Sequence, residues 1–208
     1  GDAGFAEAVG PQGKLVAMDA DQENLALALK NLEPWRDRVK AFHGNFRDVL
    51  TLKVQANVVF ADLGLSSAHL DLPERGFTFR NNGPLDLRFD RSKGKTASAW
   101  LQEVEDKELL RVLREYGELK DAKYLTKVIL ESARTEPGIQ TTDALKTCID
   151  QAMGYRAPQV LPQIFQALRI AVNDELSALD SLLDALPALL LPGGRAGIIS
   201  FHSLEDRI

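Results

Sequence analysis

Residues 56–63 read ANVVFADL, a short run of apolar and β-branched residues that ends with the acid Asp62 followed by Leu63. A second run of this kind, KLVAMD at residues 14–19, ends in Asp19. Strands that are apolar throughout are typical of a parallel sheet covered on both faces. Leucines and alanines at helical spacing in residues 22–32 indicate a crossover helix between parallel strands. The pattern therefore predicts an α/β fold.

The remaining elements follow from the same periodicities. Further strands are expected at residues 39–43 and 195–201, and helices at 5–9, 96–104, 106–116, 121–134 and 142–153. Thr142 or Asp143 is expected to cap the last of these helices. A long amphipathic helix should follow, with Pro187 as its expected break and residues 192–194 (PGG) as a turn. The run of helices without strands predicts a small helical domain inserted into the α/β domain.

Composition limits the class of protein. The chain has 208 residues, 45% of them hydrophobic, which suffices for one domain with a small insertion. No apolar run reaches the roughly 18–20 residues that cross a bilayer, so no membrane segment is expected. The single cysteine, Cys148, excludes an internal disulfide and fits a reducing cytoplasm. A net charge of −5 argues against non-specific coating of nucleic acid.

The acids at the strand ends are the first candidates for chemistry. Ligands of open α/β sheets bind at the carboxyl ends of the strands, where Asp62 lies, and an acid such as Asp19 can accept hydrogen bonds from ribose hydroxyls. The alternatives are a solvated carboxylate at Asp62 and a helix N-cap at Asp19. Residues 1–4 (GDAG) precede a helix signal, which suits a close approach of the backbone to a ligand. These residues leave nicotinamide and S-adenosylmethionine cofactors equally open.

Between residues 64 and 95 the periodicity stops, and glycines, prolines and charges dominate. A loop of this length is usually functional or disordered, and its aromatic and leucine residues favour an ordered functional loop. Its basic residues outnumber its acids, which suggests a modest patch for RNA phosphates. Pairing of Arg88 with Asp86 or Asp90 is the alternative.

Residues 62–90, DLGLSSAHLDLPERGFTFRNNGPLDLRFD, closely resemble the signature of the small-subunit ribosomal RNA cytosine-N(4) methyltransferases, the RsmH/MraW family. The resemblance continues in EYGE at 115–118, in FQALRIAVNDEL at 165–176 and in PGGRAGIISFHSLEDRI at 192–208. The blocks lie in the family's order along almost the whole chain.

The resemblance implies a Rossmann-like S-adenosyl-L-methionine (SAM)-dependent methyltransferase sheet with an inserted helical substrate-recognition domain. The expected domain boundaries are 1–95 and 158–208 for the methyltransferase domain and 96–157 for the insertion. Such an enzyme transfers a methyl group to the exocyclic amine of a cytidine in small-subunit ribosomal RNA. The expected partner is the small ribosomal subunit in the cytoplasm, without membrane or metal, and a homodimer is compatible with this interpretation. Relative to the family, both ends of the enzyme are expected to be missing.

The resemblance also implies roles for particular residues. The cofactor-binding positions are Ala3, Gly4, Phe5, Asp19, Phe46, Asp62 and His69, and the catalytic candidates are Asp62, Ser66 and Ser67. Two departures concern the methionine end of the cofactor site. The family has Gly-Gly-His where this chain has Ala3-Gly4-Phe5, and it has glutamine at the position of His69.

Two other functions compete with methyl transfer. A nicotinamide-dependent oxidoreductase would account for the strand pattern and Asp19, but it leaves residues 62–90 unexplained. A non-catalytic relative that binds RNA or a ribosomal subunit would be consistent with the departures at residues 3–5.

Overall fold

Residues 2–208 are described by the computed structural model, with the side chains of Asp2, Ser67 and Ala68 outside the described set. The chain divides into two units. The sheet unit comprises the residues up to 64 together with 89–91 and 176–208, and the helical unit comprises 65–88 and 92–175. No helix in the described part of the chain combines the length and apolar character that a bilayer span requires.

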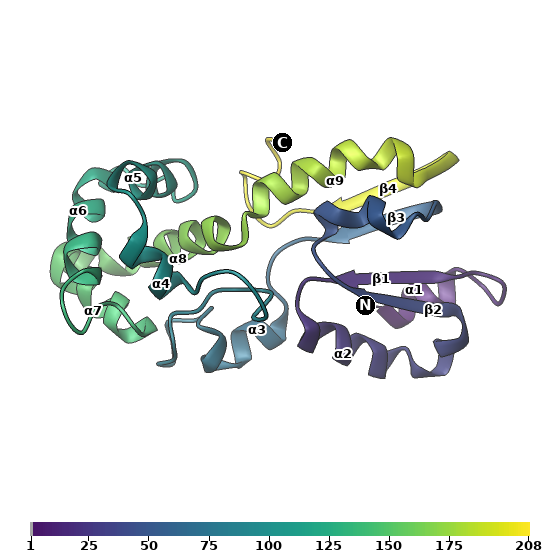
Figure 1. The fold of residues 1–208 in the computed structure, drawn as a ribbon, viewed down its shortest axis with the longest axis horizontal. Helices are drawn as coiled ribbons and strands as arrows, with labels where there is room; N and C mark the ends of the chain where they lie inside the picture. The colour runs from purple at the N-terminus through teal and green to yellow at the C-terminus, as the bar shows by residue number, and fades with distance from the viewer. Residues whose placement is uncertain (1) are drawn as a thin grey trace. The chain divides into compact units, whose positions relative to one another are not determined.

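The sheet unit is built on two pairs of parallel strands (Figure 1). β1 (Leu15–Asp19) pairs with β2 (Val39–His43), so that Asp19 lies opposite His43. β3 (Ala56–Asp62) pairs with β4 (Leu190–Ile199), so that Asp62 lies opposite Ile199. The predicted parallel α/β architecture is confirmed. Each predicted strand-end acid lies at the carboxyl edge of its pair.

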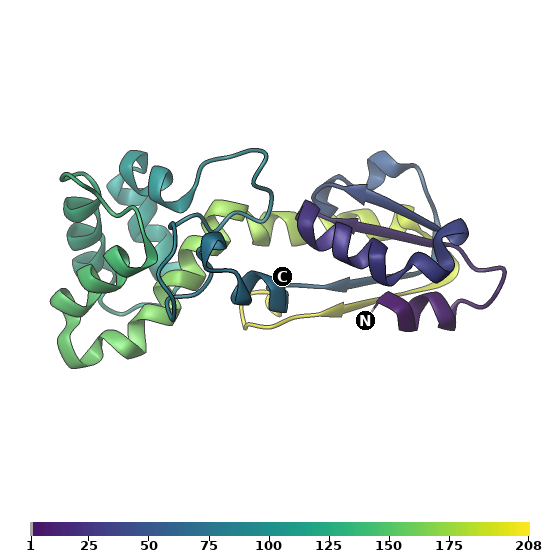
Figure 2. The ribbon, with the colours of Figure 1, turned by 90° about the horizontal axis from the view of Figure 1, so that it is seen from below.

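α1 (Asp2–Ala8) precedes the first strand. The helices and short 3-10 turns that follow are α2 (Gln22–Asn31), η1 (Glu33–Arg38), η2 (Phe46–Leu52) and, before β4, α9 (Glu175–Leu189). α9 packs against β3, because Leu182, Ala185 and Leu189 form a buried cluster that Val59 and Ala61 contact. The apolar side of α9 thus covers the face of β3 from which Val59 and Ala61 project, and Figure 2 shows the same elements from below.

Two expectations for this region were wrong. Pro187 does not break the helix, because α9 continues through it to Leu189, whose side chain is buried. The break lies at Asp174, where the backbone enters the left-handed region at φ 50°. Residues 192–194 do not precede the last strand but form an irregularity within β4, since Ala56 pairs with Leu190 while Val58 pairs with Arg195.

The helical unit contains the four helices predicted between residues 96 and 153, within one or two residues. They are α4 (Ala97–Glu103), α5 (Asp106–Glu115), α6 (Ala122–Ala133) and α7 (Thr142–Met153). α8 (Ala157–Asn173), which has Pro162 inside it, is the first part of the expected long amphipathic helix, and its bounds were not predicted. The unit also contains α3 (Ser67–Asp71) and the short turns η3 (Pro73–Arg75) and η4 (Gly154–Arg156). α8 contacts α4, α5 and α7. Burial raises the pKa of the Cys148 thiol, so this side chain acts as a small apolar residue of the core.

The cap of α7 differs from the expectation. Thr141, rather than Thr142 or Asp143, caps the helix, and its hydroxyl accepts the amide of Ala144 at 3.1 Å. Thr142 is fully buried and instead holds the long loop, since its hydroxyl oxygen accepts the amide of Gly83 at 3.1 Å.

The loop after β3 is ordered, as expected, and much of it is buried. Phe77, Leu85 and Leu87 are at most 5% exposed. Gly76 has φ +74°, and a Cβ atom there would lie 2.3 Å from the carbonyl oxygen of Pro84. The loop therefore folds back closely on its own backbone.

Replacement of Gly76 by alanine should destabilise the protein more than the matched change Gly94→Ala. Both glycines have φ +74°, but a Cβ at Gly94 meets nothing within 4 Å. The loss at Gly94 should be limited to about 1–2 kcal/mol for the left-handed backbone. At Gly76 the clash should add about 1–3 kcal/mol. Urea unfolding of the two variants measures the difference, and equal midpoints would contradict the close approach.

Candidate functional site at the strand ends

Asp19 is held at the carboxyl edge of β1 by the backbone around it. Its Oδ1 accepts the amide of Asp21 at 2.7 Å, and its carbonyl oxygen accepts the amide of Gly44 at 2.9 Å. The second of these bonds ties the end of β1 to the residue after β2. The carboxylate of Asp19 is therefore fixed in orientation where the two strands end.

The N-cap of α2 is Asp21 and not Asp19. The Asp21 carboxylate accepts the amides of Glu23 and Asn24 at 2.8 and 3.4 Å. Asp21 is 2% exposed and has the extended backbone that an N-cap requires. The alternative interpretation of Asp19 as the helix cap is therefore wrong, because Asp19 lies two residues before the cap.

The end of β2 has a contact that the sequence did not indicate. His43 Nε2 lies 3.0 Å from the carbonyl oxygen of Ala20 and 3.7 Å from the Asp90 carboxylate. Arg91 lies 3.9 Å from Glu23 on the same unit. Residues 89–91 thus belong to the sheet unit, although the sequence showed them only as part of a long loop. No periodicity in that loop could have located this contact.

Phe46 begins η2 directly after this strand end. Asn45 caps the turn by accepting the amide of Arg47 at 3.0 Å. The partly buried Phe46 side chain packs against the apolar cluster of α9. An aromatic ring is therefore anchored next to the carboxyl edge of β2, on the element that follows it.

The predicted glycine-rich segment is helical from Asp2 onward, so it does not form the loop that was expected before a helix at residues 5–9. Gly1 lies outside the described residues. Gly4 is exposed, and a Cβ there would meet nothing within 4 Å. The ring of Phe5 lies 4.7 Å from that of Phe60, so this departure from the family's histidine packs on β3.

Asp62 is exposed at the end of β3. Among the described backbone and side chains, no hydrogen bond or ion pair engages its carboxylate. The chain continues along β4, because the amide of Leu63 donates to the carbonyl of Ile199 at 3.1 Å. Gly64 follows with φ +89°, and a Cβ there would lie 3.3 Å from the Phe201 ring. The strand end thus presents an acceptor without an intramolecular partner among these residues.

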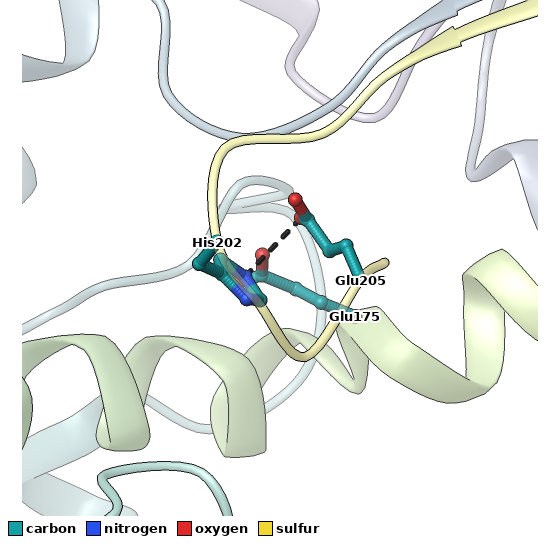
Figure 3. A group of neighbouring side chains, drawn as sticks. All are labelled: Glu175, His202 and Glu205. Carbon is teal, nitrogen blue, oxygen red and sulfur yellow. Dashed lines mark ion pairs between the residues drawn. The ribbon is translucent and has the colours of Figure 1, made fainter. Parts of the chain in front are cut away.

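Beyond β4 a buried polar pair fixes the chain. His202 Nε2 lies 3.2 Å from a carboxylate oxygen of Glu205, and Figure 3 shows both side chains within the turn at residues 202–205. The other oxygen of Glu205 accepts the amide of Phe201 at 2.8 Å. Because Glu205 is 8% exposed, its carboxylate holds the turn from inside. Glu205 thereby holds the backbone of Phe201, whose ring lies beside Gly64.

Ser66 and His69 belong to the helical unit, where they form a capping box on α3. Ser66 Oγ accepts the amide of His69 at 3.3 Å, and His69 Nδ1 accepts the amide of Ser66 at 3.1 Å. His69 is buried, with its ring centroid 4.9 Å from that of Phe77. Histidine thus provides here the side-chain acceptor that glutamine provides in other capping boxes. The side chain of Ser67 lies outside the described residues.

Two arginines of the predicted basic patch, Arg75 and Arg88, are bound by contacts within the long loop. Arg75 is 2% exposed and donates to the carbonyl of Arg88 at 3.1 Å. Arg88 binds Asp86 through two bonds of 2.6 and 3.0 Å, which confirms the pairing alternative. Arg75 is therefore excluded from a surface for RNA phosphates, and Arg88 is held by Asp86. Arg80, Arg91, Lys93 and Lys95 are exposed, and an RNA surface made by them stays a prediction.

Together these features define an α/β protein with carboxylates at the carboxyl ends of parallel strands, the edge at which such proteins bind ligands. The model of the MraW methylase family matches residues 1–208. The chain belongs to the MraW methylase family.

The relatives are consistent with this assignment. The chain is 41% identical, over 207 residues and 95% of its length, to the ribosomal RNA small subunit methyltransferase H of Geobacter sp. (strain M21). It is likewise 41% identical over 97% of its length to the protein of that name from Thioalkalivibrio sulfidiphilus, and over 96% to that from Stenotrophomonas maltophilia (strain R551-3). The chain spans 66%, 66% and 63% of the lengths of these relatives, respectively.

The capping box makes a prediction about His69. His69→Ala should destabilise the protein by about 1–3 kcal/mol, because the partly buried amide of Ser66 loses its acceptor. His69→Gln should stay within about 1 kcal/mol of the original chain, because glutamine can accept the same bond. Chemical unfolding of both variants provides the measurement. If both variants were equally destabilised, packing against Phe77 rather than the capping bond would explain the role of His69.

Proposed function

We propose that this protein transfers a methyl group from S-adenosyl-L-methionine to the exocyclic N4 amine of a cytidine in small-subunit ribosomal RNA. The observation that carries the proposal is the 41% identity, over almost the whole chain, to proteins named ribosomal RNA small subunit methyltransferase H. The family match favours methyl transfer over the hydride transfer of a nicotinamide enzyme. The small ribosomal subunit, in the cytoplasm, is the partner that this substrate implies.

The two strand pairs are proposed to be parts of one Rossmann-like sheet. Their parallel pairing and the acids that end β1 and β3 support this arrangement. The segment that forms the helical unit, with its own buried core, supports an inserted substrate-recognition domain. The boundaries at residues 96 and 157 remain a prediction.

The residues at the strand ends suit a nucleoside with a sulfonium group. The oriented Asp19 carboxylate can accept hydrogen bonds from ribose hydroxyls, and Phe46 offers an anchored aromatic ring to adenine. Ala3, Gly4 and Phe5 on α1 and the buried His69 are proposed to contribute to the methionine end, as the family pattern implies. When bound, SAM supplies a methyl group on a sulfonium, which a nitrogen nucleophile can displace.

Asp62 is the proposed catalytic residue. The N4 lone pair of cytosine is delocalised into the ring, so the amine needs accurate positioning against the methyl group. A carboxylate that accepts an N–H of the amine can orient it and stabilise the positive charge that develops on nitrogen. Its exposure, and the absence of a partner among the described side chains, suit Asp62 to this role.

The serines are proposed to help indirectly. Ser66 caps α3 directly after the turn that follows Asp62, and it therefore sets the course of the chain leaving the strand. Ser67 is proposed to assist Asp62, because it occupies the second serine position of the family signature. The target base must leave its stack to reach such a site, as it does in other enzymes that modify bases.

Asp62→Asn should lower the rate of methyl transfer about a hundredfold at saturating SAM. The amide cannot supply the negative charge that compensates the developing cation. The full-length protein, small ribosomal subunits that lack the modification, and methyl-labelled SAM provide the assay. Asp37→Asn is the matched control, because Asp37 is an exposed acid on the same unit with a side chain 95% exposed.

A second measurement separates binding from chemistry. SAM affinity is determined by calorimetry for both variants. An unchanged rate in the Asp62 variant, with SAM binding intact, would exclude Asp62 as the catalytic residue. Failure of the protein without substitutions to bind SAM would instead favour the non-catalytic alternative.

A further inference from the structure

The helical unit carries a group of exposed tyrosines and cations at the start of α6 and the end of α7. We call it the tyrosine–lysine patch, and its residues are Lys120, Lys123, Tyr124, Lys127, Tyr155 and Arg156. The lysines are exposed, Tyr124 is 51% exposed and Tyr155 is 89% exposed. None of these residues has a role in the proposed catalytic or cofactor site.

Two contacts bring the halves of the patch together. Asp121, at the N-cap of α6, forms an ion pair with Arg156 of η4. The hydroxyl of Tyr124 donates to the carbonyl of Ala152 at 3.5 Å, near the end of α7. The two helices pack side by side (Figure 1). Tyr155 and the first turn of α6 therefore belong to one continuous surface.

The side chain of Tyr155 is exposed to solvent and does not pack into the core. It follows Gly154, which has φ 54° and ψ −128° and ends α7 in a sharp turn. Among the exposed large hydrophobic residues of the described chain, it has the highest exposure. A single exposed apolar residue is ordinary on a protein surface. Here a second exposed tyrosine and four cations accompany it.

The charge of the patch opposes that of the chain. Residues 119–128 and 151–159 contain four cations and one acid, Asp121, which is paired with Arg156. Glu118 and Asp150 lie just outside these segments. The remainder of a chain of net charge −5 is correspondingly more acidic. A polyanion would therefore be attracted to this surface more than to the chain as a whole.

We propose that the tyrosine–lysine patch binds a single-stranded segment of RNA, with a base stacked on Tyr155 and phosphates against Lys123 and Lys127. Exposed aromatic rings beside basic side chains are the combination that binds single strands, since every base has a face for stacking and every nucleotide carries a phosphate. Lys123 and Lys127 lie one turn apart on α6, so they face the same side. This inference rests on the proposed function, because it extends the substrate contact from the target cytidine to neighbouring RNA.

Two other candidates for phosphate contact are less suitable, because Arg75 is buried and Arg88 is bound to Asp86. An acidic protein surface could also attract the lysines. It would not require two tyrosine faces, and it would give no preference for single strands over duplex RNA.

The test measures the affinity of the full chain for a short RNA oligonucleotide without self-complementary segments, by fluorescence anisotropy over a range of salt concentrations. Tyr155→Ala should weaken binding about tenfold, whereas Tyr155→Phe should not, because the ring is kept. The double variant Lys123→Gln/Lys127→Gln should make the slope of log affinity against log salt less steep by about 1.4. The matched control is Lys30→Gln/Lys107→Gln, which removes the same charge from exposed lysines of α2 and α5.

Circular dichroism melts confirm that each variant is folded before its affinity is compared. Affinities and slopes of the patch variants equal to those of the control pair would overturn the proposal. So would unchanged RNA binding combined with a loss of binding to small-subunit proteins freed of RNA, because the patch would then be a protein-docking surface.

The same variants separate this inference from the proposed function. SAM binding and methyl transfer to saturating small subunits are measured in parallel. If methyl transfer occurs but the patch variants bind RNA normally, the RNA-binding role of the patch is refuted and the enzymatic function is retained. If the patch variants lose RNA affinity but the protein neither binds SAM nor transfers methyl groups, the RNA-binding surface is retained and the proposed reaction is refuted.

Discussion

The parallel pairing of β3 with β4 is the constraint on which the rest of the structure depends. It joins residues 56–62 to residues 190–199, so the whole helical unit lies within the loop that this pairing closes. The chain leaves the sheet unit after Gly64, returns to it briefly at residues 89–91, and returns finally at Leu176. Closing so long a loop is entropically unfavourable, and the buried cluster of α9 on β3 offsets it directly beside the pairing. The same pairing also fixes Asp62 at the strand end, so the candidate site and the fold share one interaction.

Local pattern was enough to predict most elements but not the places where tertiary packing overrides it. β1, β2 and β3 and the four helices α4 to α7 follow from runs and spacings of apolar residues. Pro187 was misleading, because the burial of Leu189 on β3 outweighs the loss of one helical hydrogen bond. Thr142 was misleading for a similar reason, since its hydroxyl serves the loop backbone rather than the helix. Such long-range partners cannot be read from spacing along the chain.

The candidate site shows the same limit. The positions of Asp19 and Asp62 at strand ends could be predicted because an acid after an apolar strand has a defined place in the fold. The assignment of the cap to Asp21 required the backbone geometry. Counting charges in the long loop suggested an RNA surface, yet charge counts contain no information on burial, and Arg75 is an interior residue. The contact of Asp90 with His43 joins residues far apart in the chain and could not be predicted from the sequence pattern.

The interior position of Arg75 has a kinetic consequence. Its guanidinium binds the carbonyl of Arg88 and lies 5.8 Å from the centre of the Phe77 ring, while its own carbonyl accepts the amide of Leu87. The conformational entropy of this segment is therefore lost when the protein folds and not when a ligand arrives. A ligand that contacts the segment meets a surface that already has its bound conformation, which favours rapid association. Differences in affinity between ligands are then expected mainly in their dissociation rates.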